Sequence, residues 1–247
     1  MTMKKLIYRE LYLSKKNILI CLGIGCMCFL FAVLLLLSCR FGNFAKYNEP
    51  DEIREILNAV SAYLPIMLYS IFMVEGVDAI PNQIFTDRLC GWHKFIRSSE
   101  VKAKDYVGAK YAAILILFAG GTLLMFIVCP VFFLLSGTKE INLTGLIAVL
   151  DFVLFFTDYN LPLFLWAKTR EKAMLWSSVP IFAVALIGIV AAPLTAAKFN
   201  DAVLIDVLIE KYLNGNFMQA VCIVFGILAV LLYVSYRLSV HFVEVEG

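Results

Sequence analysis

The chain has 247 residues, of which 62% are apolar and only 16% charged, and its mean hydropathy is +0.87. Soluble domains have about 45–50% apolar and about 25% charged residues, so this composition excludes an ordinary soluble protein and indicates a polytopic membrane protein. The net charge of +2 gives no reason to expect a nucleic-acid partner. The polar segments are too short to bury cores of their own, so we expect one transmembrane domain over residues 1–247.

Six apolar segments are long enough to cross a bilayer as helices. A crossing helix needs about 20 mostly apolar residues, because only helices and closed barrels satisfy their backbone hydrogen bonds in hydrocarbon. Segments of alternating hydrophobicity, which would indicate a barrel, are absent. We therefore predict an all-α fold with six transmembrane helices, over residues 17–39, 60–80, 111–135, 141–166, 173–197 and 217–239.

The distribution of lysine and arginine predicts the orientation of these helices. If the N-terminus is cytoplasmic, most of the basic residues lie in cytoplasmic segments, as the positive-inside rule requires. Both termini are therefore expected in the cytoplasm, and the chain in the plasma membrane.

Two amphipathic segments lie outside the predicted membrane helices. Residues 1–16 mix apolar and charged positions, which favours an interfacial helix over a simple basic tether. Residues 200–216 carry an apolar face opposite Asp206 and Glu210, between a possible N-cap and the Asn214-Gly215 stop. This segment is too short and too charged to cross, and we predict an extracellular amphipathic helix.

The cytoplasmic segment "FTDRLCGWHKFIRSS", residues 85–99, combines aromatic and basic residues. Its apolar residues recur at the spacing of one helix face, with Asp87, Arg88, Lys94 and Arg97 largely on the others. Such a helix can lie on the inner leaflet or enter a groove on a soluble partner, and the spacing does not choose between these two interpretations. The apolar face consists of Phe85, Leu89, Trp92 and Ile96.

Sequence motifs give no support for catalysis by this chain. A GxxxxGK[ST] phosphate loop and a GxSxG motif are both missing, and only two histidines, His93 and His241, are present. We therefore predict no catalytic residue, no metal site and no cofactor bound by this chain.

Four acidic residues lie within or near the predicted membrane helices. Glu75 and Asp78 share a face near the cytoplasmic end of the second helix, where pairing with Lys110, Arg9 or Lys168 is the favoured interpretation. Asp151 and Asp158 are seven residues apart on the fourth, and serve either interhelical hydrogen bonds or a translocation path. The second possibility makes an ion- or proton-coupled secondary transporter the alternative function, with a membrane immunity or scaffold protein a more distant one.

The layout of "MKKLIYRELYLSKKNI" (residues 3–18), six crossings and the loop after the second crossing resembles permease subunits of type-2 ABC exporters. It is most similar to the compact branch that includes bacterial exporters of amphipathic and antimicrobial peptides. The chain departs from the family's loop pattern at Ser99-Glu100, which replace a Leu-Pro turn. The matching residues are Asp87, Gly91, Trp92, Phe95, Ser98 and Lys110-Tyr111.

This resemblance implies a non-enzymatic permease in a bacterial plasma membrane, half of a translocation pathway for amphipathic peptide or lipid-like cargo. It implies that residues 1–16 form a connecting helix at the lipid surface and that a coupling helix binds a separate cytoplasmic ABC ATPase, which holds ATP and Mg. The other expected partners are a second permease copy or paralogue and membrane lipid. The implied partner-binding residues are Phe85, Asp87, Arg88, Leu89, Gly91, Trp92, Phe95 and Ile96.

Overall fold

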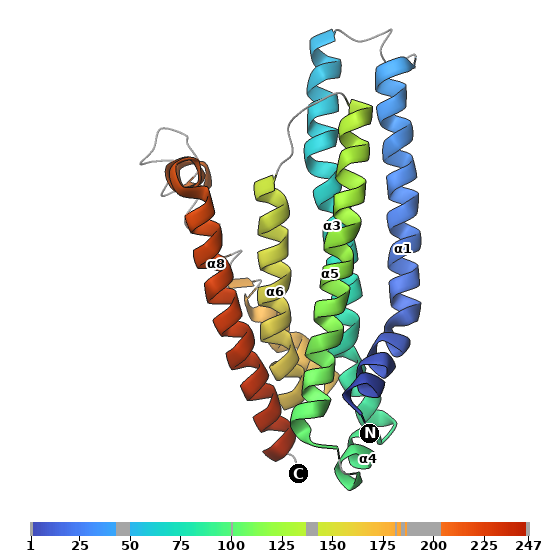
Figure 1. Ribbon diagram of the computed structural model, residues 1–247, viewed down its shortest axis with the longest axis vertical. Coiled ribbons are helices and arrows are strands. Elements are labelled where there is room, and N and C mark those ends of the chain that lie inside the picture. Colours follow the sequence, from blue (N-terminus) through green and yellow to red (C-terminus); the bar gives the residue numbers. More distant parts are fainter. Residues whose placement is uncertain are drawn as a thin grey trace. The chain divides into compact units, whose positions relative to one another are not determined.

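The fold is all-α. The structure, a computed structural model, describes residues 2–42, 50–99, 101–136, 143–180, 182–183, 186 and 204–245, and no strand occurs among them. The predicted all-α polytopic membrane protein is therefore confirmed. Its helices, drawn in Figure 1, are α1 (Met3–Phe41), α3 (Pro50–Leu89), α4 (Trp92–Ser98), α5 (Ala103–Ser136), α6 (Leu143–Trp166) and α8 (Leu204–Val245).

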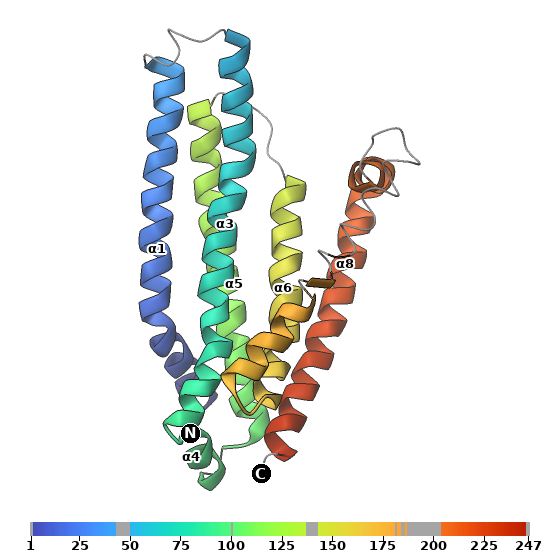
Figure 2. The same cartoon turned by 180° about the vertical axis from the view of Figure 1, so that it is seen from behind.

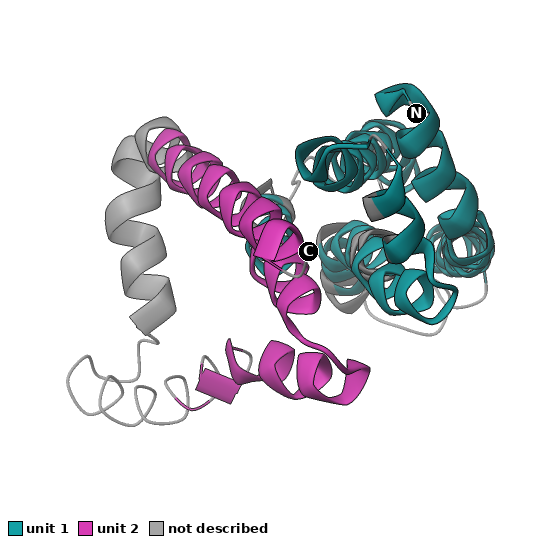
Figure 3. Ribbon diagram, turned by 90° about the horizontal axis from the view of Figure 1, so that it is seen from below, with its two compact units in different colours: residues 1–157 teal, residues 158–247 magenta. Residues whose placement is uncertain are grey.

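Contacts divide the chain into two compact units, residues 1–157 and residues 158–247, which Figure 3 colours separately. The first unit holds α1, α3, α4, α5 and the first part of α6, and the second holds the end of α6, α8 and a helical stretch over residues 170–180. In the described part of the chain, α1, α5 and the Cys222–Val245 part of α8 are long and apolar enough to cross a membrane.

Helices α1, α3, α5 and α8 extend beyond the apolar segments that predicted them, whereas α6 does not. The 39 residues of α1 span about 58 Å at 1.5 Å per residue, so the predicted interfacial and crossing helices are one continuous helix. Helix α8 likewise joins residues 204–216 to the last predicted crossing. The side chains of residues 204–216 lie outside the described residues, and so do residues 187–203 altogether. Backbone hydrogen bonding continues past the lipid boundary because it does not depend on apolar side chains.

Helices α1, α3 and α5 pack pairwise against one another and form the core of the first unit, as Figures 1 and 2 show from opposite sides. Leu36, Ile114 and Phe132 are buried between them. Large apolar side chains also point outward, and Met27 and Phe126 are each 71% exposed. Such outward faces suit lipid or another membrane chain rather than water.

Polar contacts hold the three helices at the middle and at one end. Arg40, in the last turn of α1, donates to the carbonyl oxygens of Leu134 and Leu135 at 3.0 Å each, and so satisfies acceptors that the end of α5 leaves free. Between α3 and α5, the Tyr69 hydroxyl lies 3.1 Å from Thr122 Oγ1. Because Thr122 donates its proton to the Phe118 carbonyl, Tyr69 is the donor in this contact.

We predict that Tyr69→Phe lowers the free energy of unfolding by about 0.6 kcal/mol, the average for interhelical hydrogen bonds in membranes. A double-mutant cycle with Thr122→Val, measured by unfolding in mixed micelles, isolates this coupling. Tyr63→Phe on the same helix is the control, since Tyr63 is 66% exposed. Zero coupling in the cycle would contradict the assignment.

Candidate partner-binding site

A sharp turn separates α3 from α4. Helix α3 ends at Leu89, and Gly91 adopts a φ of 69°, in the left-handed region that glycine enters most easily. A Cβ added at Gly91 would meet nothing within 4 Å, so the requirement is conformational rather than steric. The prediction that four apolar residues share one face of a single helix is therefore wrong. They lie on two helices, Phe85 and Leu89 on α3 and Trp92 and Ile96 on α4.

Burial sorts the predicted partner-binding residues into two groups. Phe85 and Ile96 face inward, with 8% and 4% of their surfaces exposed. Leu89 is 89% exposed and Phe95 54%, and Lys94 beside them is exposed as well. These three residues form what we call the exposed tip (Leu89, Lys94 and Phe95). Arg88, Gly91 and Trp92 are half-buried.

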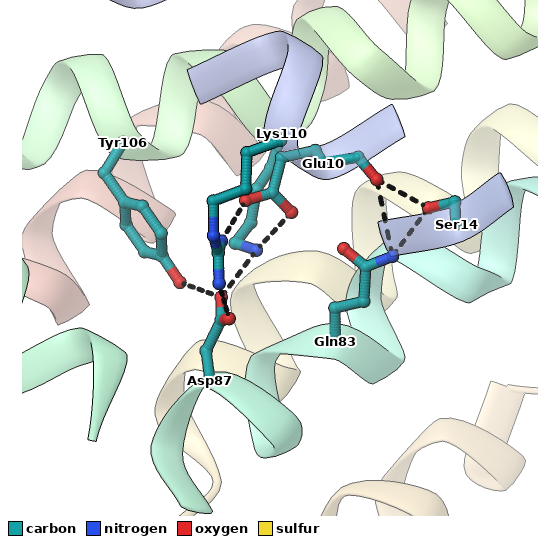
Figure 4. A network of polar contacts seen from close by, with 7 residues as sticks. Glu10, Ser14, Gln83, Asp87, Tyr106 and Lys110 are labelled. Carbon is teal, nitrogen blue, oxygen red and sulfur yellow. Dashed lines mark hydrogen bonds and ion pairs between the residues drawn. The ribbon is translucent and has the colours of Figure 1, made fainter. Parts of the chain in front are cut away.

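Close to the tip, a network of charged side chains joins α1, α3 and α5 (Figure 4). Lys110 Nζ of α5 donates to Glu10 Oε2 at 2.8 Å and to Asp87 Oδ2 at 3.3 Å. Arg9 binds the same two acids, at 2.8 Å from its Nη1 to Glu10 Oε1 and through both guanidinium nitrogens to Asp87. Tyr106 donates its hydroxyl to Asp87 Oδ2 at 3.1 Å. Two acids from different helices thus share the same two cations.

The network is buried. Glu10, Asp87 and Lys110 are 1%, 3% and 0% exposed. Burying an ion costs several kcal/mol unless opposite charge and hydrogen bonds compensate, and here two negative and two positive charges cancel.

The protonation states in the network are fixed by burial and neighbouring charge. Burial by itself lowers the pKa of Lys110, but the negative charges of Glu10 and Asp87 outweigh it and hold that pKa above its ordinary value. Burial raises the pKa of Tyr106, so its phenol keeps the proton that it donates. Both groups precede the apolar part of α5, and both keep their protons throughout the physiological pH range.

Arg9 also connects the network to α4. Its guanidinium carbon lies 4.0 Å from the centre of the Trp92 ring, within the range of a cation–π interaction. Trp92 in turn stacks on Phe95, with ring centres 5.1 Å apart. One arginine of α1 therefore contacts both the buried acids and α4, which carries two of the three tip residues.

Neutral polar groups extend the network along α1. Ser14 Oγ donates to the carbonyl oxygen of Glu10 at 2.9 Å, and the Gln83 side-chain amide hydrogen-bonds with Ser14 Oγ at 2.6 Å. A serine that bonds back to the preceding turn tends to bend a helix. Figure 1 shows the N-terminal turns of α1 at an angle to the remainder of the helix. The bend therefore lies in the same turns of α1 that contribute residues to the network.

Two serines, Ser98 and Ser99, end α4. Ser98 Oγ donates to the Phe95 carbonyl at 2.9 Å, and Ser99 Oγ donates to the Ile96 carbonyl at 2.7 Å. The Ser99 backbone nitrogen donates to the same carbonyls, so the last turn is closed without proline.

The acidic residues predicted near the pathway lie in different places. Glu75 and Asp78 belong to α3, but their side chains lie outside the described residues. Lys110 and Arg9, their expected partners, bind Glu10 and Asp87. On α6, Asp151 and Asp158 each have one buried carboxylate oxygen without a hydrogen-bond partner among the described residues.

Sequence reasoning missed most of this network. Glu10 was hidden among the mixed charges of the N-terminal segment, and Tyr106 and Gln83 carried no periodic signal. Lys110 appeared only through the resembled Lys-Tyr pair and as a possible partner of other acids. A glutamate on the otherwise basic amphipathic start was the one available clue. In the parts that the structure describes, no group of three or more histidine, cysteine or acidic residues could hold a metal ion.

The fold and the site described above are those of a helical membrane protein. Comparison with known families then identifies the family. The family described as ABC-2 family transporter protein matches residues 5–244, so the chain belongs to that family. The chain is therefore an ABC-2 type permease. This family is a membrane transport component rather than a catalytic one, and it implies a partner ATPase. No curated protein and no solved structure matches the chain.

We predict that Lys110→Met lowers the free energy of unfolding by about 3–5 kcal/mol, because it leaves Glu10 and Asp87 buried without sufficient positive charge. Thermal unfolding in detergent measures the loss. Lys102→Met removes an exposed lysine eight residues away and serves as the control. Adding Glu10→Gln to Lys110→Met restores part of the stability. Equal effects of Lys110→Met and Lys102→Met would show that the network contributes nothing.

Proposed function

We propose that this chain is the permease subunit of an ATP-driven exporter, that it supplies half of the translocation pathway, and that it binds a separate cytoplasmic ATPase through the exposed tip. The observation that carries this proposal is the contrast between the tip and the network beside it. The tip exposes two large apolar side chains, while the residues that anchor it are buried.

The tip has the properties of a docking element. Leu89 and Phe95 offer an apolar contact, and Lys94 beside them and Lys102 further along are exposed cations. Apolar anchors with surrounding charge favour an apolar groove with acidic groups at its rim. The expected partner surface is therefore such a groove on the ATPase.

The ion network gives movement of the tip a route to the membrane helices. Asp87 is two residues before Leu89, and its carboxylate binds Lys110 of α5 and Arg9 of α1. A displacement of the end of α3 therefore acts on all three helices through charged contacts rather than through a flexible loop. Of the predicted partner-binding residues, Asp87, Phe85 and Ile96 would position the tip, and Leu89 and Phe95 would contact the ATPase.

The family resemblance and the outward apolar faces support a proposal for the cargo and for the permease partner. An amphipathic peptide or a lipid-like molecule suits a pathway bounded by apolar helices better than a small polar solute does. A second permease copy or a paralogue would complete the pathway.

We expect Leu89→Ala and Phe95→Ala each to weaken ATPase binding by about 2 kcal/mol, or about thirtyfold in Kd, if they are hot-spot anchors. Co-purification from the native membrane and ATP hydrolysis in proteoliposomes measure this. Phe41→Ala, at the far end of α1 and 74% exposed, is the matched control. Phe85→Ala should instead lower thermal stability. If purification never retained an ATPase with a phosphate-binding loop, the exporter function would be wrong.

Asp151 and Asp158 each have a carboxylate oxygen without a partner among the residues that the structure describes, which favours a second candidate, an ion- or proton-coupled secondary transporter. We predict for the exporter that Asp151→Asn and Asp158→Asn leave transport dependent on ATP, with altered substrate handling or packing. Transport assays in vesicles with and without ATP and with imposed ion gradients distinguish the two. Loss of a cation or pH dependence, with no dependence on ATP, would establish the secondary transporter instead.

A further inference from the structure

A cavity of about 160 Å³ lies between α1, α3 and α5, far from the exposed tip. It is partly open to its surroundings and its lining is apolar. On α1 it extends from residue 21 to residue 29, about 12 Å along the helix at 1.5 Å per residue. The lining residues that matter below are Cys21, Leu22, Gly25, Cys26, Leu68 and Met125.

Small residues create this hollow. Gly25 lines it from α1 and Gly121 from α5, and a Cβ added at Gly25 would meet nothing within 4 Å. An apolar cavity of this size offers water no hydrogen-bond partners, and such cavities bind apolar molecules instead. The ligand it fits is therefore hydrocarbon. A helix with its side chains is about 10–12 Å across and cannot enter, whereas a single alkyl chain can.

A cation, Lys15, lies on the same face of α1 as the cavity and closer to the N-terminus. Lys15 is exposed and precedes Leu22 and Cys26 by seven and eleven residues, the spacing of one face of a helix. Leu22 is about 10 Å further along the axis, within the roughly 15 Å of hydrocarbon in one leaflet. A headgroup at Lys15 and a chain in the cavity therefore match the dimensions of one lipid.

Exposed tyrosines beside Lys15 place this level of α1 at the boundary between lipid and water. Lys15 Nζ lies 3.7 Å from the centre of the Tyr12 ring, and Tyr12 stacks on Tyr8 with ring centres 6.1 Å apart. Both tyrosines are more than half exposed. Tyrosine and lysine side chains are typical of the headgroup level, where an apolar body and a polar end are both satisfied.

We propose that α1, α3 and α5 bind one anionic phospholipid, whose phosphate pairs with Lys15 and whose acyl chain occupies the cavity. The apolar lining of the cavity and its dimensions favour an alkyl chain. The cation Lys15 favours an anionic headgroup. The site is separate from the exposed tip, so it does not depend on the exporter function.

The test uses the full-length protein in vesicles that contain a phosphatidylglycerol with a photoreactive group near the end of one acyl chain. Illumination and peptide mapping are expected to place the label on residues 21–29 and 121–128. A phosphatidylcholine with the same acyl chains is expected to label these peptides less. An excess of unlabelled phosphatidylglycerol should suppress the labelling of these peptides, because a defined site can be saturated. Labelling of Phe31, which faces outward, should not be suppressed.

Paired variants separate the cavity from general lipid contact. Gly25→Leu fills the cavity and is expected to reduce its labelling at least about tenfold, because the displaced methylenes lose their burial. Gly23→Leu is the matched control, since Gly23 is exposed, has open space at its Cβ and does not line the cavity. Lys15→Gln should abolish the preference for phosphatidylglycerol, and Lys16→Gln should keep it.

Three results would overturn the proposal. Labelling that is spread evenly over the outward faces and is not suppressed by competition would mean ordinary solvation by lipid. Equal labelling of Gly25→Leu and Gly23→Leu, with both variants folded, would mean that the chain does not enter the cavity. Disulfide cross-linking of Cys26 between two copies in place of lipid labelling would mean that a second permease covers the opening.

Discussion

The ion network of Glu10, Arg9, Asp87 and Lys110 is the constraint on which the first unit depends. Apolar helices in a bilayer gain little from contacting each other rather than lipid, because lipid tails are as apolar as leucine. Apolar packing alone therefore sets the relative positions of α1, α3 and α5 only weakly. Two acids and two cations inside protein have few arrangements in which all are neutralised, and the observed one fixes all three helices together.

The same network decides what remains available for partners. It places Asp87 inward and holds Trp92 against Arg9, and so leaves Leu89 and Phe95 on the outside. Further along the bundle the Tyr69–Thr122 contact is between neutral groups, and small residues leave the apolar cavity. The bundle thus has a charged network at one end and an open apolar site within it. This arrangement suits a protein that binds a soluble partner at its surface and lipid along its length.

Periodicity and composition predicted the all-α membrane fold, because each depends on the local chain alone. They failed at residues 85–96, where a regular apolar spacing indicated one helix. Gly91 breaks that helix, and a glycine within a periodic segment is compatible with either continuation or a turn. They also failed at Glu10 and Tyr106, because no local pattern distinguishes a buried ionised residue from a solvated one. The family resemblance pointed to this segment of the chain, but it did not indicate which of its residues face outward.

By itself the sequence determined that this is an all-α membrane protein without the motifs of an enzyme, and its residues 5–244 carry the pattern of the ABC-2 family. Those properties follow from hydrophobicity and short motifs, which are readable along the chain. Only the tertiary structure decided that Glu10 meets Lys110 across one hundred positions, that Phe85 is buried while Leu89 is not, and that Gly25 faces a cavity. The physical reason is that charge pairing and cavity formation depend on distances between helices, and a linear sequence does not contain those distances.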